Sequence, residues 1–386
     1  MNLISPSSPE DLAQALKDGA ASRKSISISG NNSKRLMAGP ILPAEINIST
    51  QNLRRILHYE RDDLTLSVEA GMPFSDLQAA LRREGQMIAL DPPFAASGTI
   101  GGVVAANLSG PMRRGFGTAR DLCIGMTFAT LEGDLVKTGG MVVKNVAGLD
   151  MGKLMIGSFG TLAVLTSINF RVHPLPQKTQ TFLFSSQEPG PVFTKRDELL
   201  RSVLKPLAID ILTPAVAARF SQRGFVLAVR GEGSRSVLAR YSRELSDFET
   251  LPHGDEETFW AKIQEFTPEF LKRQPNGVVL RISSPLSEMP QVLRCTSDAC
   301  LARAGSGITY VYLASAHAIA PIWNAARQKK WSVTVDLAPD EVRGSRDLWL
   351  SDLCGPDSNT FAMMRRVKSM FDPAGLLNRS RLYGRI

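Results

Sequence analysis

The sequence predicts an α+β protein of two domains, and three observations support this. Its 386 residues exceed what a single hydrophobic core usually serves. Residues 25–90 contain several short stretches in which apolar and polar residues alternate, which indicates strands with few helices. After residue 179 strands and helices alternate along the chain, which indicates a second unit of different architecture.

The first elements follow from local signals. Ser8, Pro9 and Glu10 form an N-cap signature ahead of the apolar Leu12 and Leu16, which predicts a helix to about residue 17. Strands are expected at 25–29, 45–50, 54–59 and 64–69. A helix at 74–84, ended by Gly85, and a strand at 86–90 complete this part.

Residues 91–176 are unusually rich in glycine. Because glycine costs backbone entropy in helices and strands, this density suggests close approach of the backbone to a bound molecule. Residues 97–102, SGTIGG, predict a tight turn that feeds a short helix and exposes backbone amides to phosphate or carbonyl oxygens. Taken alone, this segment is equally a glycine-rich surface turn.

A second turn, at 30–34, follows the strand at 25–29. Its sequence is GNNSK, and asparagine is the residue that best tolerates left-handed backbone after glycine. Taken alone, it is best interpreted as a simple β-turn. A dinucleotide-binding Rossmann unit is not indicated, because GxGxxG and a following acidic residue at the proper spacing are absent.

The central stretch continues with a basic loop at 113–117 and a hairpin whose strands are expected at 125–131 and 135–138. A helix is expected at 151–155, and a strand follows at 163–172.

The second half is predicted from its alternating pattern. Strands are expected at 182–184, 208–212, 225–230, 278–282, 309–313 and 333–337, and helices at 195–204, 235–248, 257–266, 289–302 and 318–328. This order predicts a ferredoxin-like α+β domain. A last helix at 359–370 precedes a loop with the sequence FDPAGLLNR.

Taken together, these motifs resemble one family. The combination consists of TIGG at 99–102, GxxRD at 117–121, GGMVVKNVAGLD at 139–150, GSxGTL at 157–162 and FDPAG at 371–375. It resembles the FAD-binding domain of the vanillyl-alcohol-oxidase or PCMH type, and within it the FAD-binding subunits of bacterial glycolate oxidases. The resemblance is good over residues 30–174 and the C-terminal tail, and poor over the second domain.

The resemblance implies a domain organisation. Residues 1–176 would form a PCMH-type FAD-binding domain of two small α+β subdomains with FAD between them. Residues 177–354 would form the α+β cap domain, and residues 355–386 would return to the FAD domain.

The resemblance also implies a cofactor site. FAD is expected to be non-covalent, because the Gly30 turn contains neither the histidine nor the cysteine to which related proteins attach the flavin. Lys144 would place a cation near the flavin's pyrimidine end, and Asp150 would cap the helix expected at 151–155. The candidate cofactor-binding residues are Gly30, Asn31, Asn32, Ser33, Lys34, Pro92, Gly98, Thr99, Ile100, Gly101, Gly102, Asn107, Arg120, Asp121, Lys144, Gly148, Asp150, Gly160, Thr161 and Val164.

Composition excludes several classes of function. The net charge of +8 is scattered along the chain, so nucleic-acid binding is not expected. The four cysteines contain no CxxC, which favours reduced thiols in a cytoplasmic protein and places any iron–sulfur centre on another chain. Cys295 and Cys300 are a weak candidate metal pair on the helix expected at 289–302, and no metal is expected. Neither a signal peptide nor a spanning segment is indicated.

The sequence shows a flavin site but no recognisable catalytic base, since its four histidines are not clustered. The resemblance therefore implies an FAD-binding subunit that oxidises a small 2-hydroxy acid, such as glycolate, beside a catalytic flavoprotein subunit and an iron–sulfur subunit. Attachment to the inner face of the membrane through that complex is an alternative to a purely cytoplasmic location. Two other hypotheses are a self-sufficient FAD-dependent oxidoreductase and a scaffold subunit without cofactor.

Overall fold

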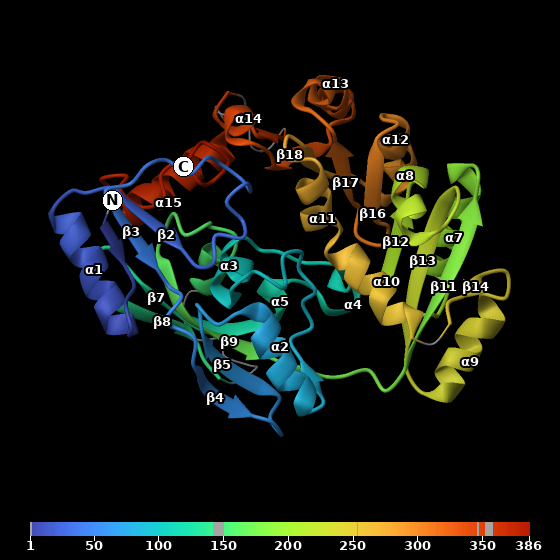
Figure 1. Cartoon of the computed structure of the whole chain (residues 1–386), viewed down its shortest axis with the longest axis horizontal. Helices are drawn as coiled ribbons and strands as arrows, with labels where there is room; N and C mark the ends of the chain where they lie inside the picture. The colour runs from blue at the N-terminus through green and yellow to red at the C-terminus, as the bar shows by residue number, and fades with distance from the viewer. Residues whose placement is uncertain (1, 142–149, 253, 346, 352–357) are drawn as a thin grey trace.

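The computed structural model describes residues 2–141, 150–252, 254–345, 347–351 and 358–386, and the fold is α+β. Figure 1 shows the N-terminal half at one end of the molecule and a large sheet at the other. The C-terminal helix α15 (Asn359–Phe371) follows the large sheet in sequence and lies beside the N-terminal strands.

A small parallel sheet begins the chain, in the order β1 (Asn2–Ile4), β3 (Ile46–Ser49), β2 (Ile26–Ser29). Helix α1 (Pro9–Ala21) packs on it through the buried Leu12 and Leu16. The Ser8 hydroxyl accepts a hydrogen bond from the amide of Asp11 at 3.0 Å, which confirms the predicted N-cap. The helix is one turn longer than expected from the sequence.

A five-stranded antiparallel sheet forms the next layer. Its order is β4 (Ile56–Glu60), β5 (Thr65–Glu69), β9 (Val164–Arg171), β7 (Cys123–Ala129), β8 (Leu135–Gly139). The helices associated with it are α2 (Phe74–Arg83), α3 (Ile100–Ala105), α4 (Arg113–Phe116), α5 (Ala119–Leu122) and α6 (Gly152–Met155). The strand expected at 86–90 is only β6 (Gln86–Met87), which pairs with β10 (His173–Pro174).

A nine-stranded antiparallel sheet occupies the other end of the molecule. Its order is β14 (Glu249–Thr250), β11 (Thr179–Ser186), β13 (Phe225–Glu232), β12 (Ala208–Leu212), β16 (Ala299–Arg303), β17 (Ile308–Leu313), β15 (Val278–Ser283), β18 (Ser332–Leu337), β19 (Trp349–Leu350). Strands β15 to β18 lie in the order 2-3-1-4, as in a ferredoxin-like unit, and β11 to β14 repeat this order. The ferredoxin-like prediction is therefore confirmed, and the sheet contains two such units joined along β12 and β16.

Helices cover this sheet. They are α7 (Pro189–Arg201), α8 (Pro214–Ala217), α9 (Arg235–Glu244), α10 (Asp255–Gln264), α11 (Phe266–Arg273), α12 (Met289–Arg294), α13 (Ile319–Lys329) and α14 (Asp340–Ser345). Figure 1 shows α7, α12 and α13 on the outer side, while α10 and α11 lie toward the N-terminal half.

One element was predicted wrongly. The helix expected at 289–302 ends at Arg294, and the chain then forms strand β16. The reason is tertiary, because β16 is hydrogen-bonded to β12 on one side and to β17 on the other. Cys295 and Cys300 therefore do not share a helix, and among the described residues no cluster of potential metal ligands occurs.

The loop at residues 36–38 is hydrogen-bonded to the end of β18, which connects the N-terminal half to the large sheet. Met37 forms a β-bridge with Leu337 at the end of β18. The amide of Ala38 donates to the carbonyl of Asp336, and the amide of Ala338 donates to the carbonyl of Leu36, both at 3.0 Å. The loop that follows the Gly30 turn is thus held directly by the large sheet.

Candidate functional site

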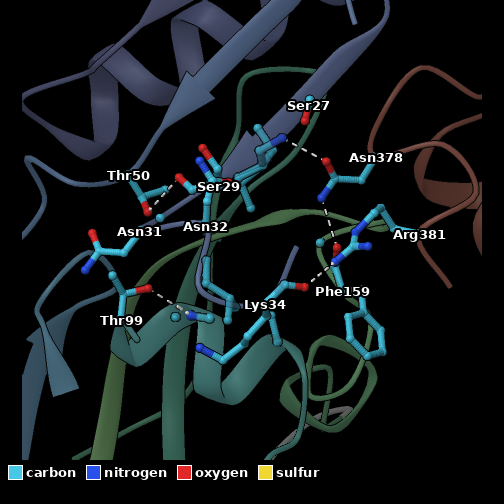
Figure 2. A pocket seen from close by; sticks show the side chains of 18 of the residues that line it. Ser27, Ser29, Asn31, Asn32, Lys34, Thr50, Thr99, Phe159, Asn378 and Arg381 are labelled. Carbon is cyan, nitrogen blue, oxygen red and sulfur yellow. Dashed lines mark hydrogen bonds between the residues drawn. The ribbon is translucent and has the colours of Figure 1, made fainter. Parts of the chain in front are cut away.

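A cleft of about 510 Å³ lies where several separate segments of the chain meet. Most of its wall comes from the end of β2 with the following turn, from helix α3 with Thr99 before it, from residues between 159 and 165, and from the C-terminal tail, and Leu3, Asn47, Thr50 and Ala70 also line it. Figure 2 shows these side chains around the hollow. Both glycine-rich turns singled out in the sequence are therefore brought to one site.

The first turn, at Gly30, is packed closely on the second. A β-carbon at Gly30 would lie 2.6 Å from the hydroxyl oxygen of Thr99, which is closer than real contacts allow. Asn32 has a φ of 54°, the left-handed conformation that asparagine tolerates. Glycine and asparagine are thus required by the shape of this turn.

The second turn caps helix α3. The hydroxyl of Thr99 accepts a hydrogen bond from the amide of Gly102 at 3.3 Å. A β-carbon at Gly101 would lie 2.8 Å from the β-carbon of Ala70, so only glycine fits there without displacing the neighbouring backbone. The amides of Ile100 and Gly101 donate to the carbonyls of Met72 and Ala70, so this turn offers a ligand a narrow floor without side chains and not a set of free amide donors.

Lys34 supplies a cation at this floor. A β-carbon built on Gly98 would lie 2.7 Å from the Lys34 ammonium, which shows how closely the side chain covers the second turn. The ammonium donates to the hydroxyl of Ser33 at 3.0 Å. Burial lowers the pKa of Lys34 to about 8, although the Glu265 carboxylate opposes this shift. An anion in the cleft would restore the charged form.

The C-terminal tail closes the cleft. The side-chain amide of Asn378 accepts from the amide of Ile28 at 2.8 Å and donates to the carbonyl of Phe159 at 2.9 Å. It therefore links β2 to the segment that precedes β9 (Figure 2). Arg381 donates to the carbonyl of Met37 at 2.8 Å, and its guanidinium lies 5.9 Å from the centre of the Phe159 ring. Burial lowers the pKa of Arg381 to about 10, and the nearby Arg343 adds to this shift.

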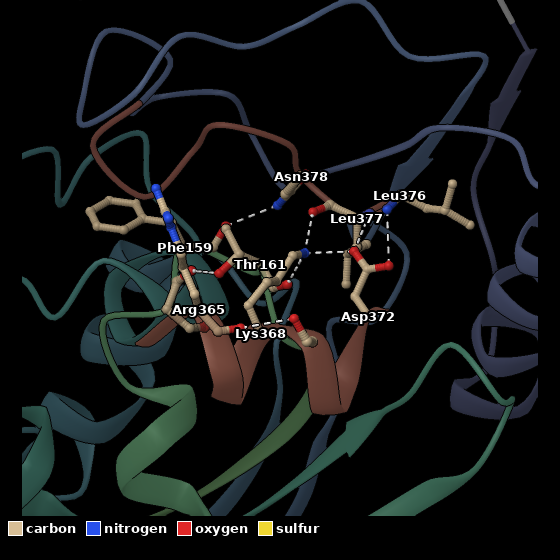
Figure 3. Close-up of polar contacts among 10 residues, drawn as sticks. Phe159, Thr161, Arg365, Lys368, Asp372, Leu376, Leu377 and Asn378 are labelled. Atoms are coloured by element: carbon tan, nitrogen blue, oxygen red, sulfur yellow. Dashed lines mark hydrogen bonds and ion pairs between the residues drawn. The ribbon is translucent and has the colours of Figure 1, made fainter. Parts of the chain in front are cut away.

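A buried ion pair holds the tail in this position. The Lys368 ammonium donates to Asp372 at 2.6 Å and to the carbonyls of Thr161 and Leu377 at 2.6 and 3.1 Å. The carboxylate of Asp372 accepts from the amides of Leu376 and Leu377 at 2.9 and 2.8 Å. Figure 3 shows this network beside Asn378.

The structure places the sequence-predicted site residues in three groups. Ten of them line the cleft: Gly30, Asn31, Asn32, Ser33, Lys34, Thr99, Gly101, Gly102, Gly160 and Val164. Eight others lie outside its lining: Pro92, Gly98, Ile100, Asn107, Arg120, Asp121, Asp150 and Thr161. Lys144 and Gly148 fall outside the described residues.

Of the residues outside the lining, Asp121 and Asp150 have structural partners of their own, whereas Arg120 and Asn107 differ from them. Asp121 forms a capping box with Thr118, and Arg120 is exposed. Asp150 accepts from the amide of Lys153 at 3.3 Å, close to the capping role expected for it. Asn107 has a buried side-chain oxygen without a hydrogen-bond partner and a φ of 49°.

Other residues of the lining were not predicted. They include the polar Ser27, Ser29 and Thr50, the apolar Phe159 and Leu165, and the tail residues Asn378 and Arg381. Asn378 lies in the loop FDPAGLLNR that the sequence analysis singled out, whereas Arg381 lies beyond it, and nothing local to residues 376–382 indicates contact with β2.

The cleft fits FAD in chemistry and in shape. Its floor is formed by glycines at which a β-carbon would clash, and its lining adds the Lys34 ammonium, side-chain hydroxyls and apolar side chains. These are the features that a pyrophosphate, a ribose and an aromatic ring require.

No helix in the described ranges is long and apolar enough to cross a membrane.

Comparisons with known proteins agree with this geometry. Residues 2–139 match the FAD binding domain family, and residues 355–382 match the C-terminal domain of FAD linked oxidases. The chain is 30% identical over 284 residues to the glycolate oxidase subunit GlcE of Escherichia coli, covering 73% of this chain and 74% of that protein.

Two further relatives match over shorter ranges. The glycolate oxidase subunit GlcD of Bacillus subtilis is 26% identical over 212 residues, which cover 54% of this chain and 45% of GlcD. A D-lactate dehydrogenase of Anaerostipes hadrus is 26% identical over 216 residues, which cover 55% of this chain and 45% of the relative.

Solved structures share the fold. An alkyldihydroxyacetonephosphate synthase superposes with a TM-score of 0.73 at 15% identity, over 98% of this chain and 75% of the synthase. A 4-ethylphenol oxidase from Gulosibacter chungangensis superposes with a TM-score of 0.72 at 14% identity, over 99% of this chain and 89% of the oxidase.

Proposed function

The chain belongs to the PCMH-type family of FAD-linked oxidoreductases, and from this premise we propose that it is the FAD-binding subunit of a glycolate-oxidase-like complex. The observation that carries the proposal is the meeting of the Gly30 and Gly101 turns with the Lys34 ammonium at one cleft. The match to GlcE supports the assignment to a complex.

We assign the following roles to the cleft residues. Lys34 and the Gly30 turn hold the pyrophosphate, because the ammonium and this turn meet in the cleft lining. The second turn, whose amides are bonded within the chain, forms the closely packed floor beside them. Asn378 keeps β2 and the residue-159 segment at the separation that FAD requires. Phe159 and Leu165 supply apolar wall for an aromatic ring.

Bound FAD supplies the acceptor for the two electrons released when a hydroxyl-bearing carbon is oxidised. The protein has to bind the hydroxy acid, exclude water and accept the hydroxyl proton. Among the described residues no histidine lines the cleft, so a base from a partner subunit is consistent with the proposal. We also propose the domain limits: residues 1–176 form the FAD-binding domain, residues 177–354 form the cap domain, and residues 355–386 form the C-terminal segment that returns to the FAD-binding domain.

Non-covalent attachment of FAD is part of the proposal. The cleft lining contains neither histidine nor cysteine within the described residues. Cys123 lies on β7, where burial raises its pKa, so it is a poor nucleophile toward the flavin ring.

The experiment that tests the proposal is anaerobic reduction of the flavin. The purified chain is mixed with glycolate or D-lactate, alone and with the flavoprotein and iron–sulfur subunits of a glycolate oxidase, and the flavin absorption is followed. We expect the FAD of this chain to bleach only in the presence of the partner subunits, so that the mixture loses more flavin absorption than the same partner subunits do without this chain. Bleaching by the chain alone would instead establish a self-sufficient oxidoreductase. A chain that holds no FAD under any condition would exclude the proposed role.

A further inference from the structure

A polar row crosses the side of the large sheet that faces the FAD cleft. Side chains alternate along a strand, and on β15, β17 and β18 one set, which includes Leu280, Val311 and Val333, packs in the apolar core under the helices. The opposite set includes Val279 and Tyr312, which belong to the core shared with the N-terminal half. This second face is where an apolar contact layer is expected.

Three polar residues interrupt that layer at the same level. Arg281 on β15 is paired in register with Tyr310 on β17, and with Thr334 on β18. The guanidinium of Arg281 donates to the hydroxyl of Thr334 at 3.4 Å. A guanidinium between two sheet layers is costly unless it has anionic or hydrogen-bonding partners, so this position calls for a functional explanation.

The C-terminal tail and helix α4 bring a further tyrosine and a further arginine toward Arg281 and Tyr310. Tyr383 of the tail lies near Arg281 and acts to raise its pKa, and the Tyr383 ring lies 5.8 Å from that of Phe159 in the cleft wall. Arg113 comes from α4 and donates to the hydroxyl of Ser109 at 3.2 Å. The cluster of Arg113, Arg281, Tyr310 and Tyr383 therefore adjoins the FAD cleft, and the three parts of the chain each contribute to it.

The electrostatics of this cluster favour an anion. Burial lowers the pKa of Arg113, and the charge of Arg281 lowers it further. Burial also acts to lower the pKa of Arg281, but Tyr383, Asp336 and Tyr310 together outweigh it and raise that pKa. Burial raises the pKa of both tyrosines, so each keeps its hydroxyl hydrogen.

The neighbouring carboxylates do not neutralise the cluster. Asp336 faces Arg281, and burial raises the pKa of that carboxyl. Asp210 is engaged by Arg303, the other guanidinium near Tyr310, and Asp121 is engaged by the cap of α5. Arg303 also has Asp91 nearby, whereas in the described part of the chain neither Arg113 nor Arg281 forms an ion pair within 4 Å.

The side chains are also accessible. Arg113, Arg281, Tyr310 and Tyr383 are each only half-buried, whereas their apolar neighbours Val279, Tyr312 and Leu337 are at most 3% exposed. These polar groups thus keep part of their surface exposed although they lie between two layers. Guanidinium groups and phenol hydroxyls together present the planar set of donors that a carboxylate accepts.

We propose that Arg113, Arg281, Tyr310 and Tyr383 form a subsite for the carboxylate of a small singly charged hydroxy acid. This inference rests on the proposed function and adds to it the residues that select the substrate class. Arg281 is the central member, since it contacts the tail and two neighbouring strands at once. The cap domain, which the sequence left without a role, thereby supplies the specificity of the site.

The test is direct binding of a compound that cannot be oxidised. Oxamate has one carboxylate and no hydrogen on the adjacent carbon, so it reports binding without turnover. Its affinity for the FAD-loaded chain is measured by isothermal titration calorimetry, with neutral glycolamide as the control ligand. We expect oxamate to bind and glycolamide not to bind. FAD content is measured in the same samples.

The variants separate the subsite from general damage. Arg281→Met should weaken oxamate binding by about tenfold or more, because it removes a hydrogen bond to a charged group. Tyr383→Phe removes one hydroxyl and should weaken it by about threefold to tenfold. Arg327→Met is the matched control, since Arg327 is exposed on α13 and loses the same charge away from this face.

The outcomes are distinct. Wild-type oxamate affinity in both Arg281→Met and Tyr383→Phe, with FAD retained, would overturn the subsite and leave the proposed FAD role intact. Failure of the FAD-loaded wild type to bind oxamate would also overturn the subsite and leave the proposed FAD role intact. If Arg281→Met does not fold, Tyr383→Phe decides the question. If the chain holds no FAD, the proposed function fails, and the same titration on the flavin-free chain still tests the subsite.

Discussion

The pKa of Lys34 makes FAD binding depend on pH in a way that can be calculated. Before FAD binds, burial holds this pKa at about 8, so the side chain is mostly charged at about pH 7 and mostly neutral at about pH 9. The pyrophosphate favours the charged form and returns the pKa toward its usual value of 10.5. FAD affinity should therefore fall by about tenfold between about pH 7 and pH 9.

The sign follows from proton linkage. The FAD complex binds more protons than the free chain between the two pKa values, so raising the pH through that interval favours the free chain. Lys34→Met has no proton to bind at this position. Its affinity should be lower than that of the wild type at about pH 7, and the lysine-dependent part of the pH profile should disappear.

The assay is a fluorescence titration of the flavin-free chain with FAD across this pH range. Because the same FAD is used for both proteins, ionisation of the ligand cancels in the comparison of wild type with Lys34→Met. Lys329→Met, on the exposed side of α13, controls for the loss of one positive charge. An identical pH profile in Lys34→Met and wild type would refute the placement of the pyrophosphate at Lys34.

Two further substitutions test the cleft. Asn378→Ala removes the side-chain amide that joins β2 to the residue-159 segment. We expect FAD to bind at least about tenfold more weakly, and the free energy of unfolding in urea titrations to fall by about 2 kcal/mol. Unchanged FAD affinity would show that the tail does not shape the site. Gly101→Ala places a β-carbon 2.8 Å from Ala70 and should cost about 1–3 kcal/mol and lower FAD content. Gly190→Ala is its control, with nothing within 4 Å of the added carbon, and if both variants behave alike the close-approach argument fails.

The elements predicted well from the sequence are those determined by local chemistry. Ser8 and Pro9 begin a helix because the cap and the fixed proline torsion act within one turn. The hairpin of β7 and β8 follows from a glycine turn between two strand patterns. Strand β16 was mistaken for helix because its short apolar run has no clear periodicity, and only pairing with β12 and β17 defines it.

In the candidate site, too, the residues marked by local sequence signals were predicted, and those that depend on tertiary contacts were not. The turns at Gly30 and Thr99 were recognisable because glycine and asparagine mark them in the sequence. Asn378 and Arg381 reach the cleft from the other end of the chain, where no local pattern indicates a neighbour 350 residues away. Arg281 and Tyr310 were not identified because their significance depends on the register of two strands and on which face of the sheet meets the FAD domain.

The most direct test of the central claim is the visible absorption spectrum of the purified chain, repeated on the supernatant after acid precipitation. We predict a flavin spectrum in the native protein and its complete transfer to the supernatant, because the cleft holds FAD without a covalent bond. A yellow pellet would contradict the non-covalent site. A colourless chain that cannot be reconstituted with FAD would contradict the claim that this cleft binds a flavin at all.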